Sequence, residues 1–156
     1  MHIEIIAVGQ KMPDWVNRGY ADYADRLTGD LTLALTEIPL QKRGSASQLA
    51  AAQNKEAAQI RSALHACDHI VTLDIPGREH SSESLAARLQ HWQENHRQLA
   101  LIIGGPEGIA PDIKALAHES WSLGKLTLPH PLVRIIVAEA LYRAWSINRN
   151  HPYHRA

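Results

Sequence analysis

The segment LIIGGPEGIAP, residues 101–111, is an apolar run that ends abruptly in two glycines, a proline, a glutamate and a third glycine. A continuous apolar run bounded by glycine and proline is typical of a strand that is buried on both faces of a sheet. The glycines let the backbone turn sharply and expose its N–H and C=O groups. The segment therefore predicts a buried strand followed by a loop that could hold a ligand.

Strand and helix patterns alternate along the rest of the chain. Strands are predicted over residues 2–8, 31–38, 69–75 and 98–104, and helices over about 12–28, 47–66, 81–96 and 132–147. Segment 31–38 alternates apolar and polar residues, so it is expected to be half-exposed. Such alternation predicts an α/β fold with a mostly parallel sheet and helices on both faces. The length of 156 residues fits a single domain, 1–156.

Composition narrows the class of protein. The formal net charge is zero, with 45% hydrophobic and 21% charged residues, so the chain lacks the overall basic field of a general nucleic-acid binder. The first residues do not resemble a signal peptide, and no apolar window is long enough to cross a membrane, so we expect a cytoplasmic protein without a membrane partner. The single Cys67 is expected to be a buried structural thiol. The ten histidines form no zinc-binding pattern, so no metal is expected.

Three loops are predicted to meet at the carboxyl edge of the sheet, where open α/β folds bind ligands. They are LDIPGR (73–78), GGPEG (104–108) and SLGKLTLPHPLVR (122–134). A single Gly/Pro turn is more often a simple chain reversal, but three at one edge favour a binding site. None of them matches the dinucleotide or P-loop fingerprint, so we expect a neutral, flat or bent ligand recognised by main-chain groups.

The final predicted helix, 132–147, is apolar nearly all round. Helical spacing gathers Glu139, Arg143 and Ser146 on one side, and places Arg134 on the opposite side. Two interpretations stay open for this helix: a dimer contact, or burial between neighbours within one chain. An arginine is seldom buried unpaired, so Arg134 is expected to meet a carboxylate, a phosphate or a helix end.

Polar residues near the C-terminus each allow a structural and a functional interpretation. His130 stands between two prolines, where it either belongs to a rigid loop or directs an imidazole toward a ligand. Glu139 and Arg143 are four apart, which indicates an intrahelical ion pair or a guanidinium that faces a substrate. The tail NRNHPYHRA (148–156) is either a frayed terminus or a contact for single-stranded RNA, which binds cations and aromatic rings.

Six motifs together resemble one known family. The motifs are VGQKMPDWV, EIPLQKRG, VTLDIPGR, LIIGGPEG, SWSLGKLTLPHPLVRIIVAEALYRAWSI and NHPYHR. They are similar, in order and over the whole chain, to the ribosomal large-subunit pseudouridine N3-methyltransferases of the SPOUT class. The resemblance implies that S-adenosylmethionine is the cofactor and that N3 of a pseudouridine in 23S ribosomal RNA is methylated on the assembled ribosome. It also implies a homodimer and a C-terminal deep trefoil knot.

The same resemblance implies residue roles. The cofactor-binding residues it implies are Leu73, Gly104, Gly105, Leu123, Gly124, Lys125, Leu126, Thr127 and Leu128. The candidates for holding the target base and easing its deprotonation are Arg143, Tyr153, His154, Arg155 and His130. The glycines at 104 and 105 are expected to let the chain pass close to the cofactor, and Glu107 either lies near the sulfonium or, as we favour, caps the loop. Local basic residues are expected at Lys42, Arg43 and in the tail, and the tail of one subunit is expected to complete the site of the other.

Two alternatives stand beside the methyltransferase. A non-catalytic RNA-binding or ribosome-assembly module would use the tail alone and would not bind S-adenosylmethionine. An α/β nucleotide-binding enzyme of another kind, for example an ATP-dependent one, is a second alternative, although the chain has no Walker or Rossmann fingerprint.

Overall fold

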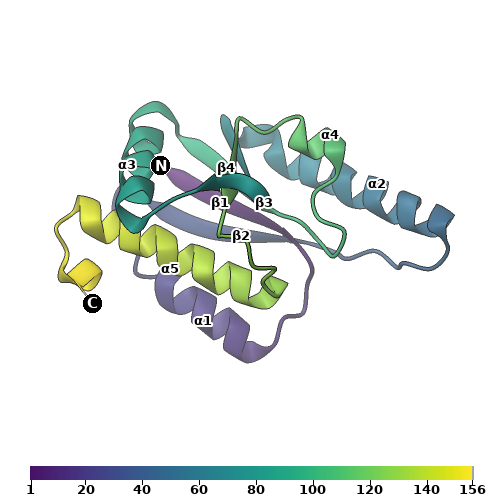
Figure 1. Ribbon diagram of the computed structural model, residues 1–156, viewed down its shortest axis with the longest axis horizontal. Helices are drawn as coiled ribbons and strands as arrows, with labels where there is room; N and C mark the ends of the chain where they lie inside the picture. Colours follow the sequence, from purple (N-terminus) through teal and green to yellow (C-terminus); the bar gives the residue numbers. More distant parts are fainter. Residues whose placement is uncertain (156) are drawn as a thin grey trace.

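A computed structural model describes residues 1–155, in which five strands form one sheet (Figure 1). The strand order is β2-β1-β4-β3-β5, and all neighbouring strands run parallel. The elements are β1 (His2–Val8), α1 (Asp14–Ala24), β2 (Thr32–Ile38), α2 (Ala46–Ala63), η1 (Leu64–Ala66), β3 (His69–Glu79), α3 (Ser82–Asn95), β4 (Gln98–Ile103), α4 (Pro111–Lys114), β5 (Glu119–Ser122), α5 (His130–Asn148) and η2 (Pro152–Arg155). The predicted parallel α/β fold is confirmed.

Helices cover both faces of the sheet, as the apolar strands predicted. Helices α1, α3 and α5 lie on one face, whereas α2 and α4 lie on the other (Figure 1). Because side chains alternate along a strand, Ile3 and Ile5 of β1 pack with α3 and α5, while Ile6 packs with α2. Strand β2 forms one edge of the sheet and is largely half-buried, in agreement with its alternating pattern.

Local signals explain where two of the helices begin and end. Helix α3 begins after Ser81, whose hydroxyl accepts a hydrogen bond from the Ser84 N–H at 3.1 Å. Helix α1 ends at Ala24, earlier than the predicted residue 28. The Leu27 N–H bonds to the carbonyl of Ala24, three residues earlier, so the chain leaves the α-helical path before Gly29 turns it with a φ of +76°.

The short elements β5 and α4 are absent from the sequence-based prediction. Strand β5 has the sequence ESWS, which contains no apolar run and only one large apolar side chain, Trp121. It is a strand because it pairs with β3 at the edge of the sheet, a long-range contact that local periodicity does not reveal. Helix α4 is only one turn long and begins at Pro111.

Strand β3 extends to Glu79, beyond the predicted end at residue 75. Its pairing with β5 shifts in register, because Leu73 and Arg78 both lie opposite Trp121. The intervening residues bulge out of the ladder at the carboxyl end of the sheet. A Cβ on Gly77 would lie 2.8 Å from the carbonyl carbon of Trp121, so a side chain at this position would force the two strands apart.

Helix α5 packs against the sheet and against α1 and α3. This packing covers most of its apolar surface within the chain. Leu132 and Ile136 remain 39% and 36% exposed, and Trp15 of the neighbouring helix α1 is 51% exposed. The chain therefore leaves apolar surface on this helix pair, and the dimer contact stays a prediction. No helix within residues 1–155 is long and apolar enough to cross a membrane.

Arg134 of α5 is fully buried and joins α5 to the carboxyl ends of two strands. Its guanidinium lies 2.7 Å from a carboxylate oxygen of Glu37 at the end of β2, and it donates to the Gly9 carbonyl after β1 at 2.8 Å. Its Nε donates to the Nε2 atom of His130 at 3.0 Å. The prediction that Arg134 meets a carboxylate is confirmed.

His130 continues this chain of contacts to the loop after β4. The guanidinium of Arg134 can only donate, so the Nε2 atom of His130 must carry the lone pair. The proton of the neutral imidazole is then on Nδ1, which faces the Gly104 carbonyl at 3.3 Å. Burial and the neighbouring Arg134 cation lower the pKa of His130 below its ordinary value. His130 therefore stays neutral in the folded chain at neutral pH.

Replacing Arg134 by Met should be strongly destabilising, because it leaves Glu37, the Gly9 carbonyl and His130 without their donor. We expect the free energy of unfolding, measured in urea, to fall by about 3 kcal/mol. The control Arg18→Met removes an exposed ion pair with Asp14 and should cost less than about 0.5 kcal/mol. Equal losses in the two variants would contradict this account of Arg134.

The depressed pKa of His130 predicts a pH dependence of stability. As pH falls below about 6.5 the unfolded state takes up a proton before the folded state does, so stability is complete above that pH and decreases below it. In His130→Gln the side-chain oxygen can still accept from Arg134, and the slope of unfolding free energy against pH between about 6.5 and 5 should become shallower. Chemical denaturation across this range measures the slope, and His91→Gln, at an exposed position, is the control. An unchanged slope in His130→Gln would refute the prediction.

Candidate functional site

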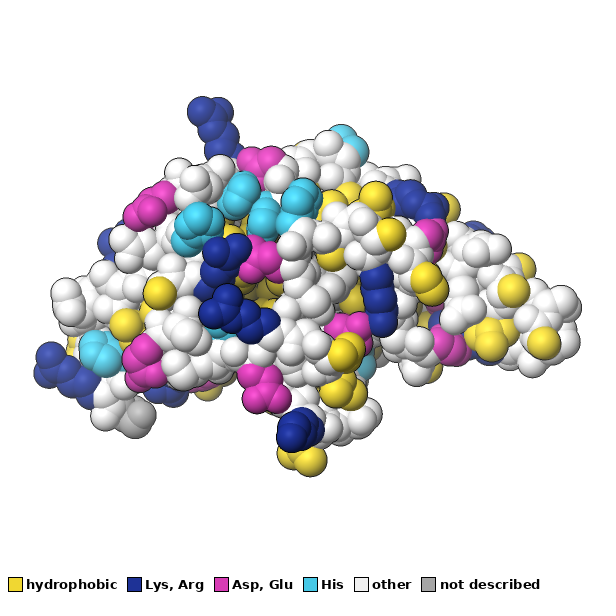
Figure 2. Space-filling model, turned by 45° about the horizontal axis from the view of Figure 1, so that its top comes forward, with side chains coloured by type: hydrophobic (Ala, Val, Ile, Leu, Met, Phe, Trp, Pro, Cys, Tyr) yellow, Lys and Arg dark blue, Asp and Glu magenta, His cyan; other side chains and the backbone are white. Residues whose placement is uncertain are grey.

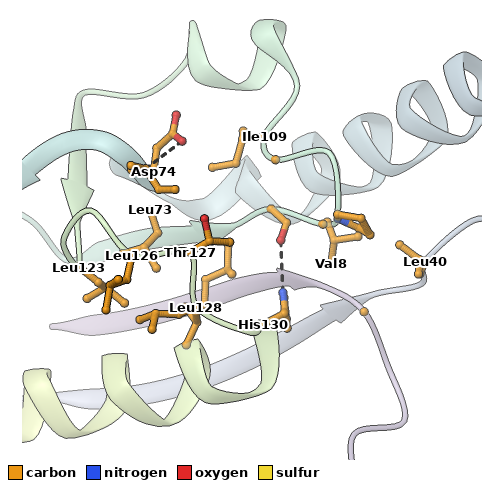
Figure 3. A pocket seen from close by; sticks show the side chains of 18 of the residues that line it. Val8, Leu40, Leu73, Asp74, Ile109, Leu123, Leu126, Thr127, Leu128 and His130 are labelled. Carbon is orange, nitrogen blue, oxygen red and sulfur yellow. Dashed lines mark hydrogen bonds between the residues drawn. The ribbon is translucent and has the colours of Figure 1, made fainter.

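The carboxyl ends of the central strands enclose one cavity of about 560 Å³ (Figure 3). The three loops that the sequence predicted to meet do line it: the end of β3, the loop after β4 and the segment before α5. Two further contributors were missed, the end of β1 at Val8 to Gln10 and the side chain of Leu40 after β2. A glycine directly after strand β1, in VGQ, was the available signal, since β1 is parallel to its neighbours and ends at the same edge.

The cofactor-binding residues implied by the resemblance lie together, with one exception. Those that line the cavity are Leu73, Gly104, Gly105, Leu123, Gly124, Leu126, Thr127 and Leu128. Lys125 is exposed and is not part of the lining, so its side chain offers no contact to a ligand here. Gly124, beside it, has a φ of +121°, which lets the chain reverse between β5 and α5.

The glycines after β4 are required by the fold of the loop itself, and their predicted close approach to a cofactor stays a prediction. A Cβ on Gly104 would lie 2.6 Å from the carbonyl carbon of Gly108, so this position is glycine because the loop folds back on itself. The Gly108 N–H donates to the Gly105 carbonyl at 2.9 Å and closes that turn. A Cβ on Gly105 would lie 3.1 Å from a methyl group of Val8. The glycines thus shape the loop itself, and access to a ligand is a consequence of that shape.

Most side chains around the cavity are aliphatic. Val8, Leu73, Ile103 and Ile109 belong to its wall, and polar contacts are left largely to main-chain groups of the loops. Asp74 is the only carboxylate among the described lining residues, and it lies 2.6 Å from the ammonium group of Lys114. An apolar cavity with a few polar groups is typical of a site for a small organic ligand.

His130 lines the same cavity, but the structure does not favour it as a catalytic group. The Nε2 atom accepts a hydrogen bond from Arg134. The Nδ1 atom faces the Gly104 carbonyl (Figure 3), so both ring nitrogens are engaged. Accepting a proton from a substrate would break the contact with Arg134, and the lowered pKa opposes that step. The geometry therefore favours a structural role for His130, and its catalytic role stays a prediction.

The C-terminal candidates lie next to the second half of α5. The Tyr153 hydroxyl donates to Glu139 at 3.0 Å, Arg143 pairs with Glu139 at 2.6 Å, and the Arg143 guanidinium lies 5.0 Å from the Tyr153 ring centre. Burial, and then the neighbouring carboxylate, raise the pKa of Tyr153, so the phenol stays protonated. The intrahelical ion pair predicted for Arg143 is confirmed. Tyr153, His154 and Arg155 do not line the cavity of their own chain.

A smaller polar hollow adjoins the cavity and contains Arg143. It shares Leu123 and Gly124 with the cavity, and His80 and Glu139 also belong to its lining. Its position places one arginine, Arg143, and two carboxylates, Glu79 and Glu139, directly beside the apolar cavity. The second interpretation of Arg143, a guanidinium that faces a substrate, stays a prediction.

Within the basic pair Lys42–Arg43, the guanidinium of Arg43 is not free to bind RNA, whereas Lys42 is exposed and its contact with RNA stays a prediction. The Arg43 guanidinium binds both Glu107, at 2.7 Å, and Glu56, at 2.7 Å. Glu107 therefore does not line the cavity, and the Arg43 guanidinium holds the pKa of the Glu107 carboxyl below its usual range. The predicted role of Glu107 as a cap of the loop is not excluded by this contact and stays a prediction. The two carboxylates more than balance the charge of Arg43.

Histidines gather on one face of the molecule, beside cationic and acidic side chains (Figure 2). His69 stacks between His96 and His118, with ring centres 4.1 and 4.9 Å away, and bonds to Glu119 at 2.6 Å. The amino ends of β3 and β5 carry His69, His118 and Glu119, and His96 lies just before β4, so the group is at the edge opposite the cavity. Within residues 1–155 no group of three or more His, Cys, Asp or Glu side chains is placed to hold a metal ion.

Comparison with known proteins gives a family and a close relative. Residues 1–154 match a family model described as "Predicted SPOUT methyltransferase". The chain is 68% identical over 156 residues, covering 100% of both sequences, to a protein of Dichelobacter nodosus named Ribosomal RNA large subunit methyltransferase H.

Solved structures support the fold. A probable methyltransferase from Bordetella pertussis has a TM-score of 0.58 and 14% identity, with 91% of this chain and 95% of that chain covered. A probable methylase family protein from Haemophilus influenzae has a TM-score of 0.55 and 14% identity, with 97% and 68% covered. At this identity the likeness concerns the fold alone. Together with the full-length sequence matches, these findings show that the chain belongs to the SPOUT methyltransferases and, within them, to the family of ribosomal RNA large subunit methyltransferase H.

Proposed function

We propose that this chain methylates N3 of a pseudouridine in large-subunit ribosomal RNA with S-adenosylmethionine as methyl donor. The observation that carries the proposal is the 68% identity, over the full length of both chains, to a protein named as a large-subunit ribosomal RNA methyltransferase. The cavity supports it, because residues of the matching motifs line its walls. The enzyme is proposed to act as a single-domain cytoplasmic protein on the assembled ribosome.

The cavity fits S-adenosylmethionine in size and in chemistry. About 560 Å³ lies within the usual range for cofactor sites, and the aliphatic walls suit an adenine ring. Main-chain groups of 104–108 and 123–128 are available for the purine and the ribose, and Asp74 offers a carboxylate to hydroxyl or cationic groups. When bound, the cofactor supplies an electrophilic methyl group, which leaves the protein to orient the base and to manage the N3 proton.

Arg143 is the best-placed cation for the target base. It lies in the hollow that adjoins the cavity, so a base held there would meet both the guanidinium and the methyl donor. A guanidinium beside a deprotonated N3 stabilises the negative charge that develops on the imide. The neutral Tyr153 phenol and the Glu139 carboxylate hold Arg143 in place.

The remaining tail residues are proposed to act across a homodimer. Tyr153, His154 and Arg155 do not line the cavity of their own chain, although the resemblance implies that the tail belongs to the site. The exposed Leu132 and Ile136 of α5 offer an apolar surface for a second copy. A two-fold contact there would allow the tail of one subunit to reach the cavity of the other.

Incubation with labelled S-adenosylmethionine and ribosomes that lack the modification tests the proposed reaction. We expect stoichiometric transfer of the label, which mass spectrometry of nuclease digests should locate on N3 of a pseudouridine. Calorimetry distinguishes the main alternative, because a non-catalytic RNA-binding or assembly module would show no saturable binding of S-adenosylmethionine. Absence of both binding and transfer would overturn the proposal.

Removal of residues 150–156 should abolish methylation and leave cofactor affinity within about twofold, because the cavity lies outside the tail. Calorimetry measures the affinity, and circular dichroism checks that α5 is retained. Arg155→Ala, at an exposed position, provides a milder variant that should lower the rate without changing the fold. Full activity of the truncated chain would contradict a role for the tail.

Mixed dimers test whether the tail acts across the subunits. One chain lacks residues 150–156, and the other carries Gly104→Val, whose Cβ would clash with the Gly108 backbone and spoil the cavity. If the tail works in trans, mixing the two inactive chains should restore activity, because one intact cavity then meets one intact tail. Persistent inactivity of verified mixed dimers would show that the tail acts within its own chain.

A further inference from the structure

The Arg43 side chain connects three segments beside the cavity. It contacts the loop after β2 through the Gln41 carbonyl, helix α2 through Glu56, and the loop after β4 through Glu107. Strands β2 and β4 flank β1 in the sheet, so the contact spans the end of β1.

All donors of the Arg43 guanidinium are used. Nε and one terminal nitrogen bind the two oxygens of Glu107 at 2.9 and 2.7 Å, a bidentate arrangement. The other terminal nitrogen donates to the Gln41 carbonyl at 2.6 Å and lies 2.7 Å from Glu56, which is only 5% exposed. Burying the charged carboxylate of Glu56 without a cation at a fixed position would cost free energy. The Arg43–Glu56 contact is therefore a required part of this structure.

The loop that Arg43 holds is a wall of the cavity. Gly104, Gly105, Pro106 and Gly108 line it, whereas Glu107 between them turns away toward Arg43. Three of these five residues are glycines, so their conformation receives little restriction from side chains. The bidentate contact of Glu107 with Arg43 restricts the conformation of this loop through a side chain. Leu40, on the other segment joined by Arg43, also lines the cavity.

We propose that Arg43 is a positioning residue that holds the 104–108 loop, through Glu107, in the shape that binds the methyl donor. Arg43 itself does not line the cavity, so it acts on the ligand only through the loop. Its loss leaves the loop with several conformations in the free protein, and binding must then restrict them at a cost in affinity. The inference rests on the proposed binding of S-adenosylmethionine in this cavity.

The test compares Arg43→Met, Glu107→Gln and the double variant by calorimetry with S-adenosylmethionine and by methylation of unmodified ribosomes. We expect Arg43→Met to raise both the Kd and the KM for S-adenosylmethionine about tenfold, which corresponds to a loss of ~1.4 kcal/mol of binding free energy. The kcat at saturating cofactor should stay within about twofold of the wild-type value. The double variant should bind S-adenosylmethionine no more weakly than the single variant with the higher Kd, because both changes remove the same Arg43–Glu107 interaction. Arg61→Met is the matched control, because Arg61 also joins α2 to the segment after β4, through Asp112, but away from the cavity.

Several outcomes would overturn the inference. A folded Arg43→Met protein with unchanged Kd, a fall in kcat alone, or additive losses in the double variant would each show that Arg43 does not position the loop through Glu107. If Arg43→Met does not fold, an unchanged Kd in Glu107→Gln is sufficient to reject it. A wild-type protein that does not bind S-adenosylmethionine would overturn the proposed function, and this inference with it. Wild-type binding with unaffected variants would overturn this inference alone.

Discussion

The buried guanidinium of Arg134 is the constraint on which the cavity depends. A cation without solvent needs partners in fixed positions, and here they come from the ends of β1 and β2 and from His130. These contacts set where α5 begins relative to the edge of the sheet. Because His130 in turn faces the Gly104 carbonyl, the same network reaches the loop after β4. Arg134 does not line the cavity, but its contacts fix the positions of the segments that do.

The walls of the cavity are shaped by segments of the backbone that pass close to one another. Gly104 lacks a side chain because Gly108 folds over it, and Gly77 lacks one because β5 passes beside it. Both approaches occur at the carboxyl edge, where the bulge in β3 and the turn after β4 open the space for a ligand. The result is a cavity with aliphatic side chains and accessible main-chain groups. Main-chain groups in such a lining can form hydrogen bonds with a purine and a ribose, so a charged side chain is not needed for each polar atom of the ligand.

Periodicity and turn chemistry predicted the long helices, four of the strands and the meeting of three loops, because these depend on local sequence. Strand β5 escaped prediction since its four residues become a strand only by pairing with β3. The roles of His130 and Arg43 escaped as well, because each is decided by partners distant in the sequence, Gly104 for one and Glu107 for the other. The trefoil knot follows from membership of the SPOUT family, and general topology rules would have argued against it.

The charge distribution bears on how such an enzyme selects its RNA. Eight arginines form ion pairs with carboxylates within the chain, and cations and anions are interspersed over the face in Figure 2. Lys114 is paired as well, so fewer than half of the 16 Lys and Arg side chains are left to release counterions from phosphates, which predicts weaker and less salt-dependent binding to isolated RNA than the number of cations suggests. Affinity must then come from shape and from contacts that only a folded substrate presents. A chain with zero net charge therefore gains less from attraction to phosphates than from contacts to the folded shape of its RNA.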